Sequence, residues 1–159
     1  LYAASICQQK HDHCLPFLPV LRLFKRRLEG NHMPHFIIQY SENLGEQVNM
    51  TELCAVMSKA MQQTGLFPLA GIRVRAHPMP HSSIADEHPN NAFADMILRI
   101  GEGRTDEQKA AAGAALMEVA KSAFAAQLAQ PHFALSLEII EISKRFSWKA
   151  NSIHPRLKN

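Results

Sequence analysis

Met33 and Pro34 are the residues most directly suited to chemistry, because they stand just before the apolar run Phe36 to Ile38. Inside a chain, a prolyl nitrogen is a tertiary amide that can only shape the backbone. At a free amino terminus it becomes a secondary amine, and partial burial moves the pKa of an α-amino group from roughly 7.7–8.0 towards neutrality. An amine with such a pKa is well matched to proton abstraction. Met33-Pro34 therefore predicts either an acid–base group or, inside a chain, only the start of an edge strand.

Histidines and cysteines are the other candidates for chemistry. His35, His77 and His81 titrate near neutral pH, but the sequence offers none of them a partner, so we expect all three to be structural. Four residues near the start of the chain could in principle bind a metal, although their spacing matches no zinc pattern well. They are Cys7, His11, His13 and Cys14. We therefore predict no metal site.

The composition is that of one globular domain preceded by a basic segment. A chain of 159 residues with 47% apolar content suits a single core. Residues 1–33 hold five Lys and Arg against two acidic residues, so the whole formal charge of +3 lies there. The neutral remainder predicts no nucleic-acid partner. We interpret residues 1–33 as an irregular N-terminal extension outside the mature fold, and residues 34–159 as the domain.

The expected location is the cytoplasm. No segment approaches the roughly 18 continuous apolar residues that span a bilayer, so we expect no membrane partner. In the extension, an apolar run precedes a basic cluster, which is the reverse of the order in a secretory signal. The three cysteines form no disulfide framework, which favours a reducing compartment.

From Pro34 onward the chain repeats a strand–helix–strand plan twice. The first copy predicts a strand over 36–40, a helix over 50–64 and a strand over 69–77. The second copy predicts a strand over 93–100, a helix over 105–129 and a strand over 133–142. Right-handed crossovers place both helices on one face of a four-stranded sheet. The predicted fold class is α+β, built from duplicated βαβ units.

The other face of this sheet is left uncovered. Because side chains alternate along a strand, Arg73 and Arg75 point away from the face of Ile72 and Val74. The central strands are apolar on both faces, which usually marks an association surface. We therefore expect an oligomer.

Four dispersed blocks of sequence carry a family resemblance. They are Met33-Pro34-His35-Phe36-Ile37, residues 64–75 (TGLFPLAGIRVR), residues 100–104 (IGEGR) and residues 146–154 (FSWKANSIH). Their types and order resemble the 5-carboxymethyl-2-hydroxymuconate isomerases, a family of the tautomerase superfamily.

The resemblance implies a cofactor-independent isomerase that acts as a homotrimer. Pro34 matches the family's amino-terminal proline and would be the catalytic acid–base group. Arg73 and Arg104 would bind substrate carboxylates and the developing dienolate, work that suits the planar fork of arginine. The substrate would be a small polycarboxylate enol such as 5-carboxymethyl-2-hydroxymuconate, in homoprotocatechuate degradation. No metal or organic cofactor would be needed.

Other interpretations stay open. Arg73 would be an interface ion-pair partner and Arg104 a solvated turn residue if neither binds substrate, and Arg75 is expected to be structural. Because the nitrogen of Pro34 is an amide as numbered, we expect Met33 to be the initiator, removed to free Pro34. The alternatives to this enzyme are a tautomerase of a different enol acid and a non-catalytic ferredoxin-like module that binds RNA or a small ligand.

Overall fold

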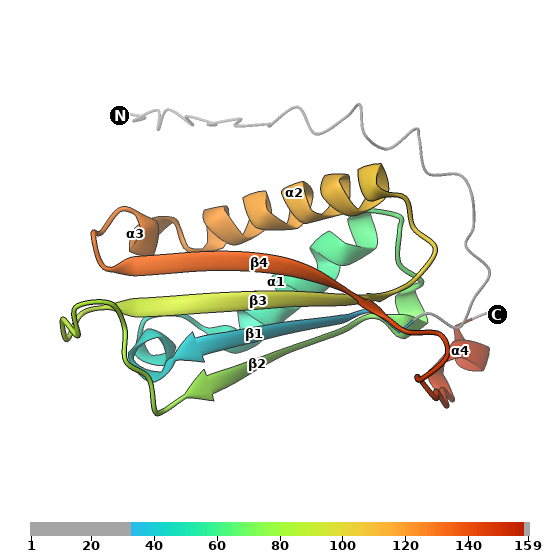
Figure 1. The fold of residues 1–159 in the computed structure, drawn as a ribbon, viewed down its shortest axis with the longest axis horizontal. Coiled ribbons are helices and arrows are strands. Elements are labelled where there is room, and N and C mark those ends of the chain that lie inside the picture. Colours follow the sequence, from blue (N-terminus) through green and yellow to red (C-terminus); the bar gives the residue numbers. More distant parts are fainter. Residues whose placement is uncertain (1–32, 158–159) are drawn as a thin grey trace, which may run out of the picture.

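The computed structural model describes residues 33–157, which form a four-stranded sheet with two long helices over it (Figure 1). The strands are β1 (His35–Ser41), β2 (Arg73–Met79), β3 (Ala92–Gly101) and β4 (Phe133–Ile142). Their order across the sheet is β2-β1-β3-β4. The long helices are α1 (Met50–Gln63) and α2 (Asp106–Ala123).

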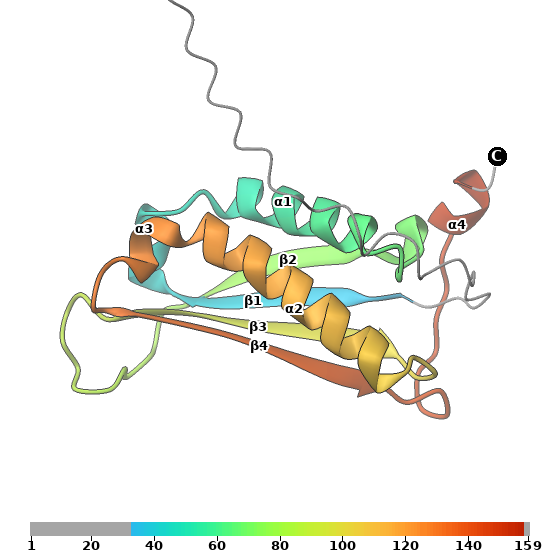
Figure 2. The same ribbon diagram turned by 90° about the horizontal axis from the view of Figure 1, so that it is seen from above.

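Each half of this domain is one βαβ unit, as predicted. Strands β1 and β2 pair in parallel, β3 and β4 pair in parallel, and the two units join through the antiparallel pair β1 and β3. A short 3-10 helix, η2 (Glu42–Glu46), follows β1. Both long helices lie over the same face of the sheet (Figure 2). This pairing brings the starts of β1 and β2 to the same end of the sheet as the ends of β3 and β4.

The bounds of α1 follow from its capping residues. The Asn49 side chain accepts hydrogen bonds from the backbone N–H groups of Thr51 and Glu52, which have no partner within the helix. After the helix, Gly65 has a φ of +66°, a left-handed conformation that glycine adopts without a Cβ penalty. The helix predicted over 50–64 therefore forms almost as expected.

The helix predicted over 105–129 is two helices. It breaks at Phe124, whose φ of −100° and ψ of 20° are not helical, and α3 (Ala125–Leu128) follows. The Phe124 ring is fully buried and lies 5.1 Å from the ring of Phe133, so core packing overrides the helical period there. No helix in the described part of the chain is both long and apolar enough to cross a membrane.

The strand predicted over 69–77 starts later than expected. Its first residues form the 3-10 helix η3 (Leu69–Gly71), in which the backbone N–H groups of Gly71 and Ile72 donate to turn carbonyls at 2.9 and 3.2 Å. These local bonds replace sheet pairing, so β2 begins at Arg73. The shift makes Arg73 the first residue of the strand.

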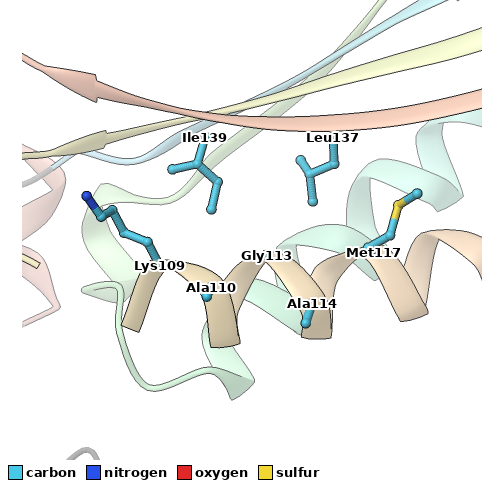
Figure 3. A pocket seen from close by; sticks show the side chains of 7 residues that line it. All are labelled: Lys109, Ala110, Gly113, Ala114, Met117, Leu137 and Ile139. Carbon is cyan, nitrogen blue, oxygen red and sulfur yellow. The ribbon is translucent and has the colours of Figure 1, made fainter. Parts of the chain in front are cut away.

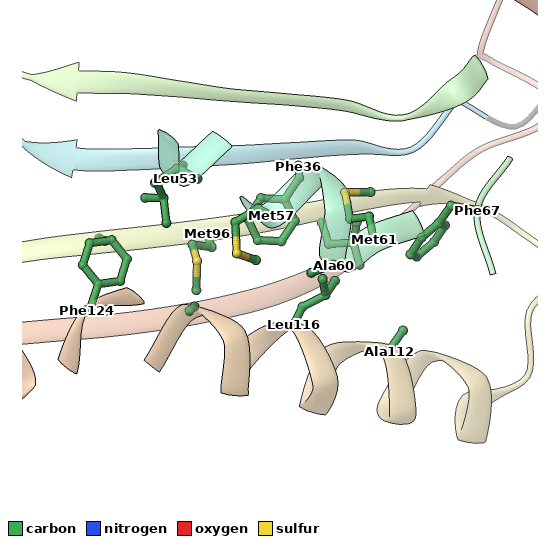
Figure 4. Close-up of a cluster of buried hydrophobic side chains, with 14 of the residues drawn as sticks. Phe36, Leu53, Met57, Ala60, Met61, Phe67, Met96, Ala112, Leu116 and Phe124 are labelled. Atoms are coloured by element: carbon green, nitrogen blue, oxygen red, sulfur yellow. The ribbon is translucent and has the colours of Figure 1, made fainter. Parts of the chain in front are cut away.

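The core lies between the helices and the inner face of the sheet (Figure 4). Phe36 and Ile38 are alternate residues of β1 and both are fully buried. Met57 from α1 and Leu116 from α2 meet this face and are likewise inaccessible to solvent. Burial of each such side chain contributes about 1.5–3 kcal/mol, which holds the sheet firmly against the helices.

The opposite face of the sheet is not covered by any helix of the described residues (Figures 1 and 2). Ile37 and Ile97 are aligned across β1 and β3 on this face and are only partly buried. Ile140 of β4 is 39% exposed. We call this surface the open face, and its presence confirms the expectation from strand alternation.

Candidate active site

Pro34 lies directly before β1, and its side chain is fully buried. Its carbonyl oxygen accepts a hydrogen bond of 3.1 Å from the Arg73 backbone N–H. The prediction that an internal Pro34 would start an edge strand is wrong, because β1 lies between β2 and β3. Pro34 is tolerated there because it precedes the strand, where its missing N–H breaks no ladder hydrogen bond. Burial at this position would disfavour an ammonium group.

Arg73 stands beside Pro34 at the start of β2. Its side chain is partly buried, and its Nη1 donates to the carbonyl oxygen of Gly71 at 3.0 Å. The register aligns Arg73 with His35, so its side chain belongs to the open face. A guanidinium has five N–H donors, and this contact uses one of them.

Arg104 follows β3 and immediately precedes the N-cap of α2. It is only 6% exposed, so the expectation of a solvated turn residue is wrong. Its Nη1 donates to the carbonyl oxygen of Gly101 at 2.7 Å and its Nη2 to that of Leu66 at 3.4 Å. The guanidinium carbon also lies 5.4 Å from the centre of the Phe67 ring. These contacts hold the guanidinium in place from three sides.

The charge of Arg104 has no acidic partner in the described part of the chain. The ion pairs found there involve Lys109 and Lys121 and none of the arginines. The Arg104 Nε is buried without a hydrogen-bond partner. Burial lowers the pKa of this guanidinium, and the charge of Glu141 opposes the shift without cancelling it. A buried charge with a free donor is costly unless an anion binds it.

The sheet topology brings Pro34, Arg73 and Arg104 to one end of the molecule. The antiparallel register pairs His35 with Arg99, which directs Pro34 towards the last residues of β3. Arg104 reaches this end through the Gly101 carbonyl. Among the described residues, no hydrogen bond links the Arg104 side chain to Pro34 or Arg73. The three predicted residues thus lie at the same end of the fold, and the Arg104 side chain is hydrogen-bonded to neither of the other two.

The segment after β4 also reaches this end. Asn151 Nδ2 donates to the carbonyl oxygen of Ala70 in η3 at 3.1 Å. The short helix α4 (Ile153–Arg156) follows and lies near the starts of β1 and β2 (Figure 1). In the same segment, Phe146 and Trp148 are exposed. This tail therefore lies at the same end of the sheet as the candidate site.

Two residues expected to be structural are in contact at this site. His35 Nδ1 lies 3.1 Å from Arg75 Nη1, across the β1–β2 pair. Alternation along β2 places Arg75 on the face of Arg73, and the predicted βαβ unit pairs β2 with β1, but neither gives the register between the two strands. Sequence reasoning missed this pair because the register was unknown.

A separate apolar groove lies between α2 and β4 (Figure 3). Its volume is about 320 Å³. The lining residues are Lys109, Ala110, Gly113, Ala114, Met117, Leu137 and Ile139. Lys109 is the single charged residue among them and already pairs with Asp106 and Glu141. The groove holds none of the predicted site residues and offers no acid–base pair.

The described residues contain no group of three or more side chains suited to hold a metal ion. The four histidines and cysteines weighed above as possible ligands, Cys7, His11, His13 and Cys14, lie outside the described residues.

The fold and the site define a member of the tautomerase superfamily. The structure of a 5-carboxymethyl-2-hydroxymuconate isomerase from Deinococcus radiodurans R1 matches with a TM-score of 0.77 and 37% identity, covering 84% of this chain and all of that one. A structure described as a fused 4-OT wild-type asymmetric trimer shares the fold, with a TM-score of 0.55 and 18% identity, covering 79% of this chain and 99% of that one.

Sequence comparison gives the family. The profile described as 5-carboxymethyl-2-hydroxymuconate isomerase matches residues 34–157. The 5-carboxymethyl-2-hydroxymuconate Delta-isomerase of Escherichia coli is 39% identical over 126 residues, which are 79% of this chain and the whole of that protein. This chain belongs to the 5-carboxymethyl-2-hydroxymuconate isomerase family, and it is an isomerase. Family membership favours the enzyme over the non-catalytic binding module.

Proposed function

We propose that this isomerase is a cofactor-independent tautomerase of a hydroxymuconate-type enol acid, the class of compound in the name of the Escherichia coli relative. The Pro34 amine takes a proton from one end of the conjugated system and returns a proton to the other. The enol becomes an unsaturated ketone with no gain or loss of atoms. The proposed substrate is 5-carboxymethyl-2-hydroxymuconate, the compound of homoprotocatechuate degradation that the family resemblance implies.

The position of Pro34 carries this proposal. It is the first residue of the family match, and it is fully buried at the end of the sheet that also holds Arg73 and Arg104. Burial disfavours the charged form of an amine, which brings its pKa towards neutral pH. A base with such a pKa acts efficiently in a proton transfer.

The two arginines supply the anion-binding part of the proposal. Arg104 has a buried guanidinium with an unpartnered Nε and no ion-pair partner among the described residues, so a substrate carboxylate is the group it lacks. Arg73 holds its guanidinium on the open face at the start of β2, opposite the buried Arg104. There it stabilises the charge that develops on the enol oxygen. Both interactions keep the substrate beside the Pro34 nitrogen.

The mechanism needs a free amine, so we propose that the active protein begins at Pro34 after removal of Met33. Residues 34–159 are then the functional domain. The family match supports this boundary, because it starts at Pro34, and the full length of the Escherichia coli relative aligns with only 126 residues of this chain.

The test combines intact mass and amino-terminal sequencing of the natively expressed protein with a ketonisation assay. We expect an amino-terminal proline and turnover of a hydroxymuconate-type enol acid. A form that retains residues 1–33 should lose at least about 100-fold in rate, the lower end of what acid–base catalysis contributes. Full activity in a protein that begins at Leu1 would contradict the mechanism.

We also propose a homotrimer. The open face leaves Ile37 and Ile97 without a covering layer in one chain, and a second copy would bury them. The fused 4-OT protein, which shares the fold, is itself a trimer.

A further inference from the structure

Three arginines and a histidine share the open face beside Pro34. The register aligns His35 with Arg73 on one side and with Arg99 on the other. Arg75 lies two residues further along β2, on the same face. Its Nη1 reaches back to within 3.1 Å of His35 Nδ1. The four side chains form a row across three strands, which we call the basic row.

The contact with Arg75 determines the state of the imidazole. A guanidinium carries donors only, so His35 Nδ1 must accept and the ring is neutral with its proton on Nε2. Burial, and after it the charges of Arg75, Arg73, Arg99 and Lys149, lowers the pKa of His35. The neutral ring orients Arg75 and presents its Nε2–H as a further donor.

The basic row has no carboxylate of its own. Within the described residues, no ion pair includes Arg73, Arg75 or Arg99. Two acidic residues lie further along the open face, and neither forms an ion pair with the basic row. Asp95 accepts a hydrogen bond of 2.6 Å from Ser136, and Glu138 belongs to no ion pair among the described residues. Cations held this close repel one another, so the row favours a bound anion.

The row lies next to the proposed base. The backbone N–H of Arg73 donates to the Pro34 carbonyl, so the row begins one residue from Pro34. Arg104 approaches the same strand start from the buried side, over Phe67. An acid with two carboxylates would thus meet a cation at each end.

We propose that Arg75, positioned by His35, forms a second carboxylate subsite, and that this subsite makes the enzyme prefer enol acids with a carboxylate remote from the reacting end. The inference rests on the proposed function, in which Arg104 holds the other carboxylate. Arg75 is then a specificity-determining residue and His35 a positioning residue.

The test measures Arg75→Gln in the natively expressed protein with two enol acids. One is a hydroxymuconate-type dicarboxylate, and the other lacks the remote carboxylate. We expect KM for the dicarboxylate to rise about tenfold to a hundredfold, the range for loss of a charged hydrogen bond. The kcat, and KM for the monocarboxylate, should stay near the parent values.

Three further variants distinguish the charge of Arg75, its planar geometry and its orientation by His35. Arg75→Lys keeps the charge without the planar fork and should fall between the parent and Arg75→Gln. His35→Leu removes the acceptor that orients Arg75 and should raise KM for the dicarboxylate alone. Lys121→Gln removes one positive charge from an exposed part of α2 and should leave KM for both acids unchanged.

Several results would overturn the subsite. Equal effects of Arg75→Gln on both acids, or no effect, would remove its role in specificity. A lower oligomer mass for this variant in native mass spectrometry would assign Arg75 to an interface instead. If the parent turns over neither acid, the proposed function fails. Calorimetric titration with glutarate, an unreactive dicarboxylate, then tests separately whether Arg75 binds a carboxylate. Equal glutarate affinities for the parent and Arg75→Gln would then overturn it.

Discussion

The fold disfavours protonation of His35, whose pKa is lowered from its ordinary value. Burial is the first cause of its lowered pKa, and the positive charges of Arg75, Arg73, Arg99 and Lys149 follow. The hydrogen bond from Arg75 requires the neutral ring, so protonation would both break this contact and add a charge to the basic row. Folding therefore releases a proton that the unfolded chain holds.

This pKa shift predicts a pH dependence of stability. The folded-state pKa lies below the unfolded value of about 6.5, so His35 contributes stability above that pH and loses it as the pH falls through the folded-state pKa. Urea unfolding of the parent and of His35→Asn should show a smaller loss for the variant between about pH 7 and pH 5. His81→Asn, at an exposed position, is the control. Identical losses in the parent and His35→Asn would contradict the linkage.

At the scale of elements, the capping box of α2 holds the backbone that carries Arg104. The Thr105 hydroxyl accepts from the Gln108 N–H at 3.2 Å, and the Gln108 side-chain oxygen accepts from the Thr105 N–H at 3.0 Å. Both donors lack partners within the helix. Because Arg104 directly precedes Thr105, this cap also defines where the guanidinium enters the core.

Removal of the cap should destabilise the domain. Thr105→Ala leaves the Gln108 N–H without its acceptor, and we expect a loss of about 1 kcal/mol in the free energy of unfolding. Thr105→Ser keeps the hydroxyl and should retain most of the stability. Denaturant unfolding at constant pH measures both. A Thr105→Ala variant as stable as the parent would show that the capping box contributes little.

At the scale of the whole molecule, the open face is the feature that a single chain leaves incomplete. One layer of helices can cover one face of a sheet, and here it covers the face of Phe36 and Ile38. Ile37 and Ile97 stay aligned on the other face. Apolar side chains aligned on an open sheet are typical of a surface that associates.

The proposed homotrimer can be tested on this surface. Ile97→Glu places a charge in the middle of the open face, where burial against another copy would be costly. We expect native mass spectrometry to show a trimer for the parent and a lower mass for this variant. Val56→Glu, at a position 40% exposed on α1, should keep the parent mass. A monomeric parent, or a trimeric Ile97→Glu, would contradict the proposal.

Much of the fold was predictable because its signals are local. The final strand was predicted over 133–142, and β4 has those bounds. The helix predicted over 50–64 forms as α1 because residue types that favour helix ends flank it, with Asn49 as its cap and Gly65 in a left-handed conformation. The break of the second helix was not predictable, because Phe124 leaves the helical period to pack on Phe133, a contact that depends on the folded core.

The candidate site divides in the same way. The sequence predicted Pro34, Arg73 and Arg104 as site residues, because a proline after methionine and arginines within family motifs can be recognised without knowing the fold. It also determined the two βαβ units and the family. The tertiary structure alone decided that Arg104 is buried and that His35 contacts Arg75. Burial and strand register join residues far apart in the chain, and their energies depend on packing that no local pattern contains.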